Sequence, residues 1–232
     1  MEYLKLIQKQ ERVILKNMNN KIPLFIRVPK TGTSSIQECL EESNVFLKVK
    51  KEELVNSFNP TKVLHAETHY IEHIVDWVTK LDKDIRKKFF IFCFVRNPWD
   101  KAVSSWKFGS WHSDWNMSFL DFCKYLLTFK GHRDNQKDDL DHCGKEFHAL
   151  PCSVFTHENQ SSPVVDFIGK FENLQEDFDT ICDKIGIPRQ KLPHKNKSKH
   201  KHYTEYYDDE TRAIVAEKYA KDIEYFGYKF GG

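Results

Sequence analysis

A run of seven apolar residues, Phe89-Phe-Ile-Phe-Cys-Phe-Val95, constrains the fold of this 232-residue chain more than any other segment. The run shows no alternation of apolar and polar residues, so a strand formed from it must be buried on both faces. Strands of this kind occur in the middle of parallel sheets, which helices cover on both sides. The segment therefore predicts an α/β protein with a central parallel sheet flanked by helices.

Other segments supply the additional strands and helices that such a sheet needs. Residues 22–28 and 164–168 are apolar enough for buried strands, and residues 62–65 for a short one. Residues 71–81 carry apolar side chains at helical spacing on one face. Strands that alternate with helices favour a single α/β architecture. Helices are expected to start at Thr33 or Ser34, at Asn97 with Pro98, at Ser118, and at a capping box of Asn173 with Glu176. The helix that starts at Asn173 is expected to end at Gly186. A last helix is expected to carry Ile214, Val215, Tyr219 and Ile223 on one face.

The length and composition of the chain suit a single domain. We expect a helical extension over residues 1–21 and one domain over residues 22–232. The net charge of +2 argues against a general nucleic-acid binder. No segment approaches the ~20 apolar residues of a membrane span, and residues 1–10 lack the features of a signal peptide. These observations predict a cytoplasmic protein, with a Golgi-lumenal fragment as the alternative if the chain is truncated.

The six cysteines are scattered along the chain and form no Cys-x-x-Cys pair. Packed free thiols are therefore the favoured interpretation. Cys143 and Cys152 are close enough in sequence to form a disulfide in an oxidising compartment, and this is the alternative.

Two segments that follow expected strands carry side chains suited to phosphate. The first, Arg27-Val-Pro-Lys-Thr-Gly-Thr-Ser-Ser35, offers Lys30, a glycine turn and four hydroxyls; the second, Phe94-Val-Arg-Asn-Pro-Trp-Asp-Lys-Ala-Val-Ser104, offers Arg96 and a serine. Ligands bind beyond the carboxyl ends of parallel strands, where helix N-termini attract anions, so both segments should face one crevice. The first loop is not a Walker A motif, because its lysine precedes the glycine. Simpler readings are a helix cap for the hydroxyls and an ion pair of Arg96 with Asp100.

The two segments together resemble the cofactor signatures of sulfotransferases that use 3′-phosphoadenosine 5′-phosphosulfate (PAPS), nearest to the carbohydrate sulfotransferases and their small bacterial-type relatives. Residues 166–174, 192–198 and 222–228 are also similar to that branch, so the likeness runs from Ile22 to the C-terminus. It implies a P-loop-kinase-like sulfotransferase fold, PAPS as donor and no required metal. The family usually has a second glycine in the first loop, where this chain has Thr33. The resemblance implies that the 5′-phosphosulfate is held by Lys30, Thr31, Gly32, Thr33, Ser34 and Ser35, and the 3′-phosphate by Arg96 and Ser104.

A catalytic base is expected among the histidines, because the acceptor hydroxyl must lose its proton as it attacks the sulfur. His65 ends a short apolar run at an expected strand-to-helix junction, and the related family tends to carry a histidine in a His-Ala context there. We predict His65 as the base, with His69 or Glu67 in reserve and a packed or capping histidine as the simpler reading. Lys30 is predicted to stabilise the leaving phosphate oxygen. The spacing of His65, His69 and His73 does not match the zincin pattern, so no metal site is predicted.

The basic run from His194 to His202 is the densest in the chain. It is interpreted as closing over the 3′-phosphate, with Lys197 and Ser198 matching the family pattern, or as a solvated loop or a contact for an anionic glycan. The prediction is a sulfotransferase acting on a hydroxyl of a carbohydrate or small molecule. A P-loop-like kinase and a non-catalytic polyanion-binding module are the alternatives. The aromatic residues that favour either a stacking surface for the acceptor or a second small core are Trp106, Trp111, His112 and Trp115.

Overall fold

The computed structural model describes residues 21–42, 46–48, 63–66, 75, 78–79, 83–112, 117–128, 148–157, 162–193 and 201–232. The chain divides into two compact units. The sheet unit comprises Met1–Val28, Gly32–Val95 and Phe155–Asn196, and the helical unit comprises Pro29–Thr31, Arg96–Val154 and Lys197–Gly232. The predicted extension over residues 1–21 lies outside the described residues apart from Lys21.

A parallel sheet of five strands, in the order β2-β3-β1-β4-β5, forms the centre of the sheet unit. Strand β4 (Phe89–Val95) pairs with β1 (Ile22–Ile26) on one side and with β5 (Phe167–Lys170) on the other. Strand β1 pairs in turn with β3 (Val63–Ala66), which pairs with β2 (Phe46–Lys48). Every pair is parallel, so the predicted α/β class with a central parallel sheet is confirmed.

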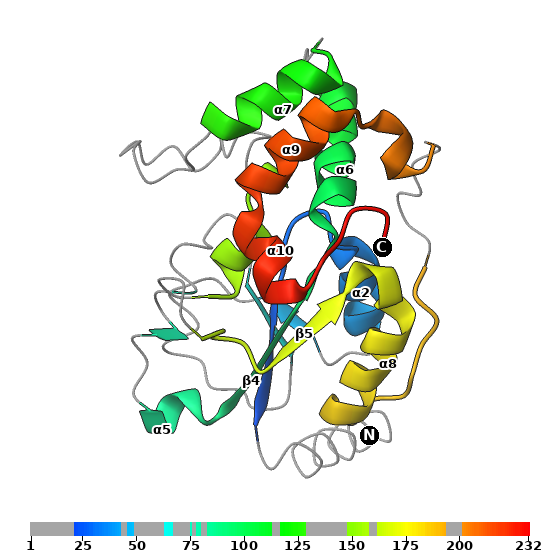
Figure 1. The fold of residues 1–232 in the computed structure, drawn as a ribbon. Coiled ribbons are helices and arrows are strands. Elements are labelled where there is room, and N and C mark those ends of the chain that lie inside the picture. The colour runs from blue at the N-terminus through cyan, green and yellow to red at the C-terminus, as the bar shows by residue number, and fades with distance from the viewer. Residues whose placement is uncertain are drawn as a thin grey trace, which may run out of the picture. The chain divides into compact units, whose positions relative to one another are not determined.

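Phenylalanine side chains of β1 and β4 cover one face of the sheet. The rings of Phe25 and Phe92, which are register partners, stack with centroids 5.1 Å apart, and the Phe94 ring meets Phe25 edge-on at 6.4 Å. Helices α2 (Thr33–Glu42) and α8 (Leu174–Ile185) pack on this face and lie on the same side of β4 and β5 in Figure 1. Strand β4 is buried on both faces, as its unbroken apolar run predicted. The helices contribute Ile36, Cys39, Leu40, Phe178, Ile181, Cys182 and Ile185 to this core.

The strand predicted over residues 164–168 is displaced, because β5 begins at Phe167. Asp166 supplies the physical reason. Its Oδ2 accepts a hydrogen bond from the Ile91 N–H (2.7 Å), while its own N–H donates to the Ile91 carbonyl (2.7 Å). Arg86 Nη2 pairs with the same carboxylate at 3.1 Å. The Asp166 side chain therefore replaces a backbone hydrogen bond of the sheet at the position where the apolar pattern predicted the middle of a strand.

The helical unit is built on helices α6 (Pro98–His112), α7 (Phe119–Thr128) and α9 (Asp209–Lys218), which lie side by side in Figure 1. The prediction of a single last helix is wrong, because α9 ends before Tyr219 and α10 (Ala220–Phe226) follows it. Tyr219 leaves helical geometry (φ −108°, ψ 25°). Its ring is fully buried, and its hydroxyl donates to the Ala149 carbonyl at 2.6 Å. The hydrogen bond that holds the Tyr219 side chain thus lies at the break between α9 and α10.

Three predicted helix signals are confirmed. At the start of α6, Asn97 Oδ1 accepts a hydrogen bond from the Trp99 N–H (3.1 Å). At the start of α7, Ser118 Oγ accepts from the Asp121 N–H (3.1 Å). Gly186 ends α8 in the left-handed conformation with φ of 75°. Each of these signals acts within a few residues, so the local sequence was sufficient to predict it.

Two predicted helix starts differ from the structure. The Asn173 side chain makes no capping hydrogen bond, because a 3₁₀ turn over Phe171–Asn173 runs directly into α8 and leaves Asn173 without an extended backbone (φ −117°, ψ 34°). Helix α2 begins at Thr33, earlier than expected. The Gly32 carbonyl accepts the first hydrogen bonds of this helix, from the N–H groups of Ser35 (3.1 Å) and Ile36 (3.4 Å).

The cysteines that the structure describes carry free, buried thiols: Cys39, Cys93, Cys123, Cys152 and Cys182. Packed thiols are therefore the observed state of these five, and Cys152 forms no disulfide. Cys143 lies outside the described residues. In the same described ranges, no helix is long and apolar enough to cross a membrane.

Candidate active site

The loop that follows β1 contains a strained backbone at Lys30. Among the described residues other than glycine, Lys30 has a positive φ, 66°, which places it in the left-handed region. This conformation costs a residue with a Cβ roughly 1–2 kcal/mol. Gly32 also has a left-handed backbone (φ 80°), and a Cβ at this position would lie 2.7 Å from Cδ2 of Leu174. The turn therefore requires glycine at position 32, and it holds Lys30 in a conformation that needs support from its surroundings.

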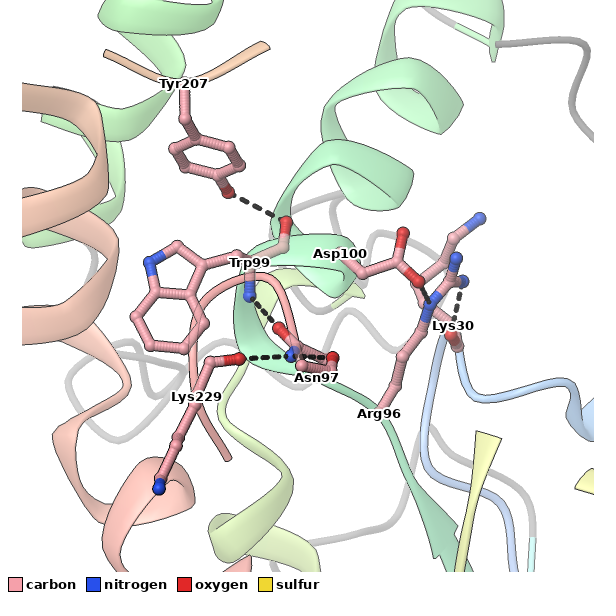
Figure 2. Close-up of polar contacts among 8 residues, drawn as sticks. Lys30, Arg96, Asn97, Trp99, Asp100, Tyr207 and Lys229 are labelled. Atoms are coloured by element: carbon pink, nitrogen blue, oxygen red, sulfur yellow. Dashed lines mark hydrogen bonds and ion pairs between the residues drawn. The ribbon is translucent and has the colours of Figure 1, made fainter. Parts of the chain in front are cut away.

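Arg96, the first residue after β4, supplies part of that support. Its Nη1 donates a hydrogen bond to the Lys30 carbonyl (3.0 Å), and its Nε donates to Oδ2 of Asp100 (2.8 Å), as Figure 2 shows. The Arg96 residue is only 8% exposed, so water screens this ion pair weakly. The two segments that the sequence analysis selected are therefore in direct contact. The simpler reading of Arg96, an ion pair with Asp100, is also present, and the arginine makes both contacts at once.

The Lys30 ammonium lies in surroundings that are partly apolar and strongly cationic. Its Nζ is 4.1 Å from the centroid of the Phe108 ring. Burial, followed by the positive charges of Arg96 and Lys101, lowers the pKa of Lys30 to about 8. A cation held beside other cations is destabilised, and a nearby anion relieves that cost. The arrangement therefore suits an anionic ligand.

One stripe of α6 carries the residues that accompany Arg96. Asp100 and Ser104 are one helical turn apart, so they lie on the same face of the helix. Asp100 holds the Arg96 guanidinium, and Ser104 is half-buried in the next turn. This geometry is compatible with the predicted pairing of Arg96 and Ser104 at one phosphate.

The neighbouring stripe of α6 is buried and carries a lysine that the sequence analysis missed. Lys101 is fully buried, and its Nζ donates to the carbonyls of His148 (2.7 Å) and Leu150 (2.8 Å). Ser105, one turn further on, donates from Oγ to the same His148 carbonyl (2.9 Å). Burial lowers the pKa of the Lys101 ammonium. The i, i+4 spacing of Lys101 and Ser105 is visible in the sequence, but nothing in it marks their stripe as the buried one.

Asp222, the first residue of the family-like segment 222–228, is a second buried ionisable residue, and its burial was not predicted. Its two carboxylate oxygens accept hydrogen bonds from the N–H groups of Cys152 (2.6 Å) and Ser153 (2.8 Å). Burial raises the pKa of the Asp222 carboxyl, and the hydrogen bonds from Ser153 and Cys152 oppose that shift. Asp222 therefore anchors the backbone of the segment that Lys101 also holds.

The four predicted hydroxyl ligands of the first loop differ in their exposure. Thr31, which belongs to the helical unit, is fully buried. In the sheet unit, Thr33 and Ser35 are buried in the first turn of α2, and Ser34 is exposed. Among these hydroxyls, Ser34 is the one whose side chain is open to solvent.

The predicted base lies near the carboxyl end of a strand. His65 is the third residue of β3 and the register partner of Phe25, and the next pair joins Ala66 to Ile26, where β1 ends. The backbone of His65 therefore lies near the carboxyl end of β1, within the sheet unit. No group of metal-binding residues occurs among the described residues. The remaining predicted site residues lie outside the described residues: Glu67, His69, Lys197 and Ser198.

The indole of Trp106 belongs to a small aromatic core in the helical unit. Its Nε1 donates to the Met117 carbonyl (3.1 Å), and its ring contacts Phe119 at 5.2 Å and Tyr206 at 6.0 Å between centroids. These contacts favour the interpretation of a second core over that of a stacking surface for this residue. The structure does not describe the side chains of Trp111 and His112, nor any part of Trp115.

A lysine loop follows one strand of this α/β protein and an arginine follows the neighbouring strand, an arrangement that suits an anionic ligand. The model of the Sulfotransferase family matches residues 17–229, and the chain belongs to this family. Membership supports a transferase of the sulfotransferase type.

Two relatives and one solved structure illustrate the similarity. Human carbohydrate sulfotransferase 9 is 27% identical over 226 residues, which cover 86% of this chain but only 46% of that protein. An uncharacterised protein of Archaeoglobus fulgidus is 30% identical over 113 residues, which cover 48% of this chain and 79% of the archaeal protein. The crystal structure of a sulfotransferase from Alicyclobacillus acidocaldarius aligns with 90% of this chain and 97% of its own, at 15% identity and a TM-score of 0.46.

Proposed function

We propose that this protein transfers a sulfuryl group from PAPS to an acceptor hydroxyl. The observation that carries the proposal is the hydrogen bond from Arg96 to the Lys30 carbonyl (3.0 Å), because it supports a common role for these two cationic residues. Membership of the Sulfotransferase family supports the same reaction class. No observation favours the kinase or the polyanion-binding module over this reading.

The donor is proposed to bind with its two phosphorylated ends on different residues. Lys30 and the loop through Ser35 hold the 5′-phosphosulfate, where the N-terminus of α2 adds a favourable dipole. Arg96 and Ser104 hold the 3′-phosphate, and the Asp100 ion pair fixes the plane of the guanidinium. Lys197 and Ser198 are proposed to add contacts to the same phosphate.

The reaction we propose is a direct displacement at sulfur. The acceptor oxygen forms a bond to sulfur while the bond from sulfur to the bridging phosphate oxygen breaks, and the products are a sulfate ester and 3′-phosphoadenosine 5′-phosphate. Lys30 stabilises the charge that develops on the leaving phosphate oxygen. His65 accepts the proton that the acceptor hydroxyl loses. The charges balance without a metal ion.

The acceptor is proposed to be a hydroxyl of a carbohydrate or small molecule. The name of human carbohydrate sulfotransferase 9 supports the carbohydrate class. The chain spans about half the length of that relative, so the acceptor is tested separately from the donor.

Calorimetric titration with 3′-phosphoadenosine 5′-phosphate tests the donor site. We expect binding by the wild type, weak binding of ATP, and a loss of nucleotide affinity of at least tenfold in Arg96→Ala, since a charged hydrogen-bonded group contributes about 1.5–3 kcal/mol. Arg189→Ala is the matched control, because Arg189 is exposed and pairs with Asp183 in the sheet unit. Absence of nucleotide binding by the wild type would refute the proposal.

Transfer of labelled sulfate from PAPS to a panel of glycans, phenols, lipids and peptides tests the reaction and identifies the acceptor class. Once an acceptor is found, His65→Ala should keep nucleotide affinity but lower turnover by about a hundredfold or more, as is usual for loss of a general base. Full turnover in His65→Ala would reject that residue as the base and leave the donor assignment intact.

A further inference from the structure

We propose that Lys101 is a positioning residue for Lys30, and that it acts through His148 and Phe108. All four residues belong to the helical unit. The function of Lys30 in holding the phosphosulfate rests on the proposed function above, whereas the contacts that join these residues do not.

The first contact fixes the backbone of His148. The buried Lys101 ammonium donates to the carbonyls of His148 (2.7 Å) and Leu150 (2.8 Å), and Ser105 Oγ donates to the His148 carbonyl as well (2.9 Å). A carbonyl that accepts two hydrogen bonds from one rigid helix has little freedom to move. Lys101 is fully buried, so its replacement would remove the ammonium donor of the Leu150 carbonyl and one of the two donors of the His148 carbonyl.

The second and third contacts transmit this position to Lys30. The His148 ring packs against the Phe108 ring with centroids 4.6 Å apart, and Phe108 in turn carries the Lys30 ammonium 4.1 Å from its centroid. Arg96 fixes the other end of Lys30 by its hydrogen bond to the carbonyl. Lys30 is therefore restrained at its backbone by Arg96 and at its ammonium by a stack that Lys101 anchors. A strained left-handed backbone at this residue fits a group whose position is set by its surroundings.

The charged groups around Lys30 influence its pKa, so a change in their arrangement can be measured as a change in the titration of Lys30. Arg96 and Lys101 are the cations whose charges act on the Lys30 ammonium after burial. Asp100, on the same helix as Lys101, is paired with Arg96. The His148 imidazole contacts the ring that carries the ammonium. Loss of Lys101 removes a cation and loosens the stack, and both effects shift the titration of Lys30 upward.

The test is competitive acetylation of Lys30 across pH, read by mass spectrometry, in the absence of nucleotide. The wild-type midpoint is expected at about 8, and Lys101→Met should move it toward the ordinary lysine value of 10.5. Tyr219→Phe is the matched control, because it removes a hydrogen bond to Ala149 of the same segment (2.6 Å) without touching Lys101 or the His148 carbonyl. It should lower stability but leave the Lys30 midpoint unchanged. Equal shifts in both variants would show a merely structural effect and overturn the proposal.

A double-mutant cycle tests the route through the stack. Phe108→Leu should also shift the Lys30 midpoint, and Lys101→Met should shift it less in the Phe108→Leu background than in the wild type, because only the direct charge effect of Lys101 then remains. Fully additive shifts would overturn the route. If Lys101→Met does not fold, Ser105→Ala replaces it in the cycle, since Ser105 holds the same His148 carbonyl (2.9 Å).

Turnover provides the link to function. With PAPS and an accepted substrate, Lys101→Met should lose about ten- to a hundredfold in turnover, the usual effect of displacing a catalytic group by about 1 Å. Failure of the wild type to bind nucleotide would reject the proposed function, while the acetylation profiles would still decide the role of Lys101. Unchanged acetylation in Lys101→Met would reject that role even in an active enzyme.

Discussion

Raising the pH from 7 to 9 should weaken the binding of 3′-phosphoadenosine 5′-phosphate about tenfold, because one pH unit above a pKa removes about nine-tenths of the protonated form. The group responsible is Lys30, whose pKa burial and the neighbouring Arg96 and Lys101 lower to about 8. In the proposed donor site, the Lys30 ammonium holds the 5′-phosphate. Affinity should therefore be constant below pH 8 and should fall with a slope of one decade per pH unit above it.

Three buried thiols stay protonated in this pH range. Burial raises the pKa of the thiols of Cys123, Cys152 and Cys182 to about 12. The second pKa of a phosphate monoester is near 6, so this ionisation is about nine-tenths complete at pH 7, where the experiment begins. Burial lowers the pKa of Lys101 as well, so the Lys30→Arg variant is needed to assign the slope to Lys30.

The assay is calorimetric titration at several pH values in pairs of buffers with different ionisation enthalpies. At pH 9 the wild type should take up close to one proton on binding, because the anion restores the Lys30 ammonium. Lys30→Arg keeps its charge throughout, so its affinity should stay level up to pH 10. Lys87→Arg, at an exposed lysine of the sheet unit, should behave as the wild type. A wild-type affinity that is constant from pH 7 to 9.5, or a Lys30→Arg profile that falls in the same way, would refute the reasoning.

Three further predictions concern stability. Gly169→Ala should destabilise the fold by about 2–3 kcal/mol in urea unfolding, since its Cβ would lie 2.6 Å from Cδ1 of Phe94; a loss below 0.5 kcal/mol would contradict this. Asn97→Ala should cost about 1–2 kcal/mol, because Asn97 caps Trp99 and donates to Lys229; Asn97→Ser should recover part of that loss. Lys30→Met should stabilise the protein by about 1–3 kcal/mol at pH 7, because it removes the cost of burying a charged ammonium. The pKa of Lys30 is about 8 in the folded state and 10.5 as the ordinary value, so the folded protein loses the Lys30 proton first and wild-type stability rises between these pH values. The stability difference between Lys30→Met and the wild type should therefore disappear near pH 10.5.

Segments whose structure depends on residues nearby in the sequence were predicted well. The Phe89–Val95 strand has the predicted limits, and the Asn97 cap and the Gly186 stop are where the sequence placed them. A strand that is buried on both faces must consist of apolar residues, so its limits show in the sequence. A helix cap bonds a backbone group only two or three residues away, so its residue type also shows there. Information of this kind is contained in a short window of sequence.

Predictions failed where a side chain forms a hydrogen bond with the backbone of a residue far away in the sequence. Asp166 binds the backbone of Ile91 and shifts the start of β5, and Tyr219 binds the backbone of Ala149 at the break between α9 and α10. Each contact joins positions far apart in the chain. No periodicity or propensity in the local sequence encodes such a partner.

The sequence by itself determined the fold class, the family and the two cationic segments, because apolar runs, glycine turns and clusters of charge are local properties. Only the tertiary structure decided how the two segments meet. It placed the Arg96 guanidinium on the Lys30 carbonyl and buried Lys101 beneath His148. Whether a lysine is a solvated charge or a buried anchor depends on what packs against it, and that packing is a property of the whole fold.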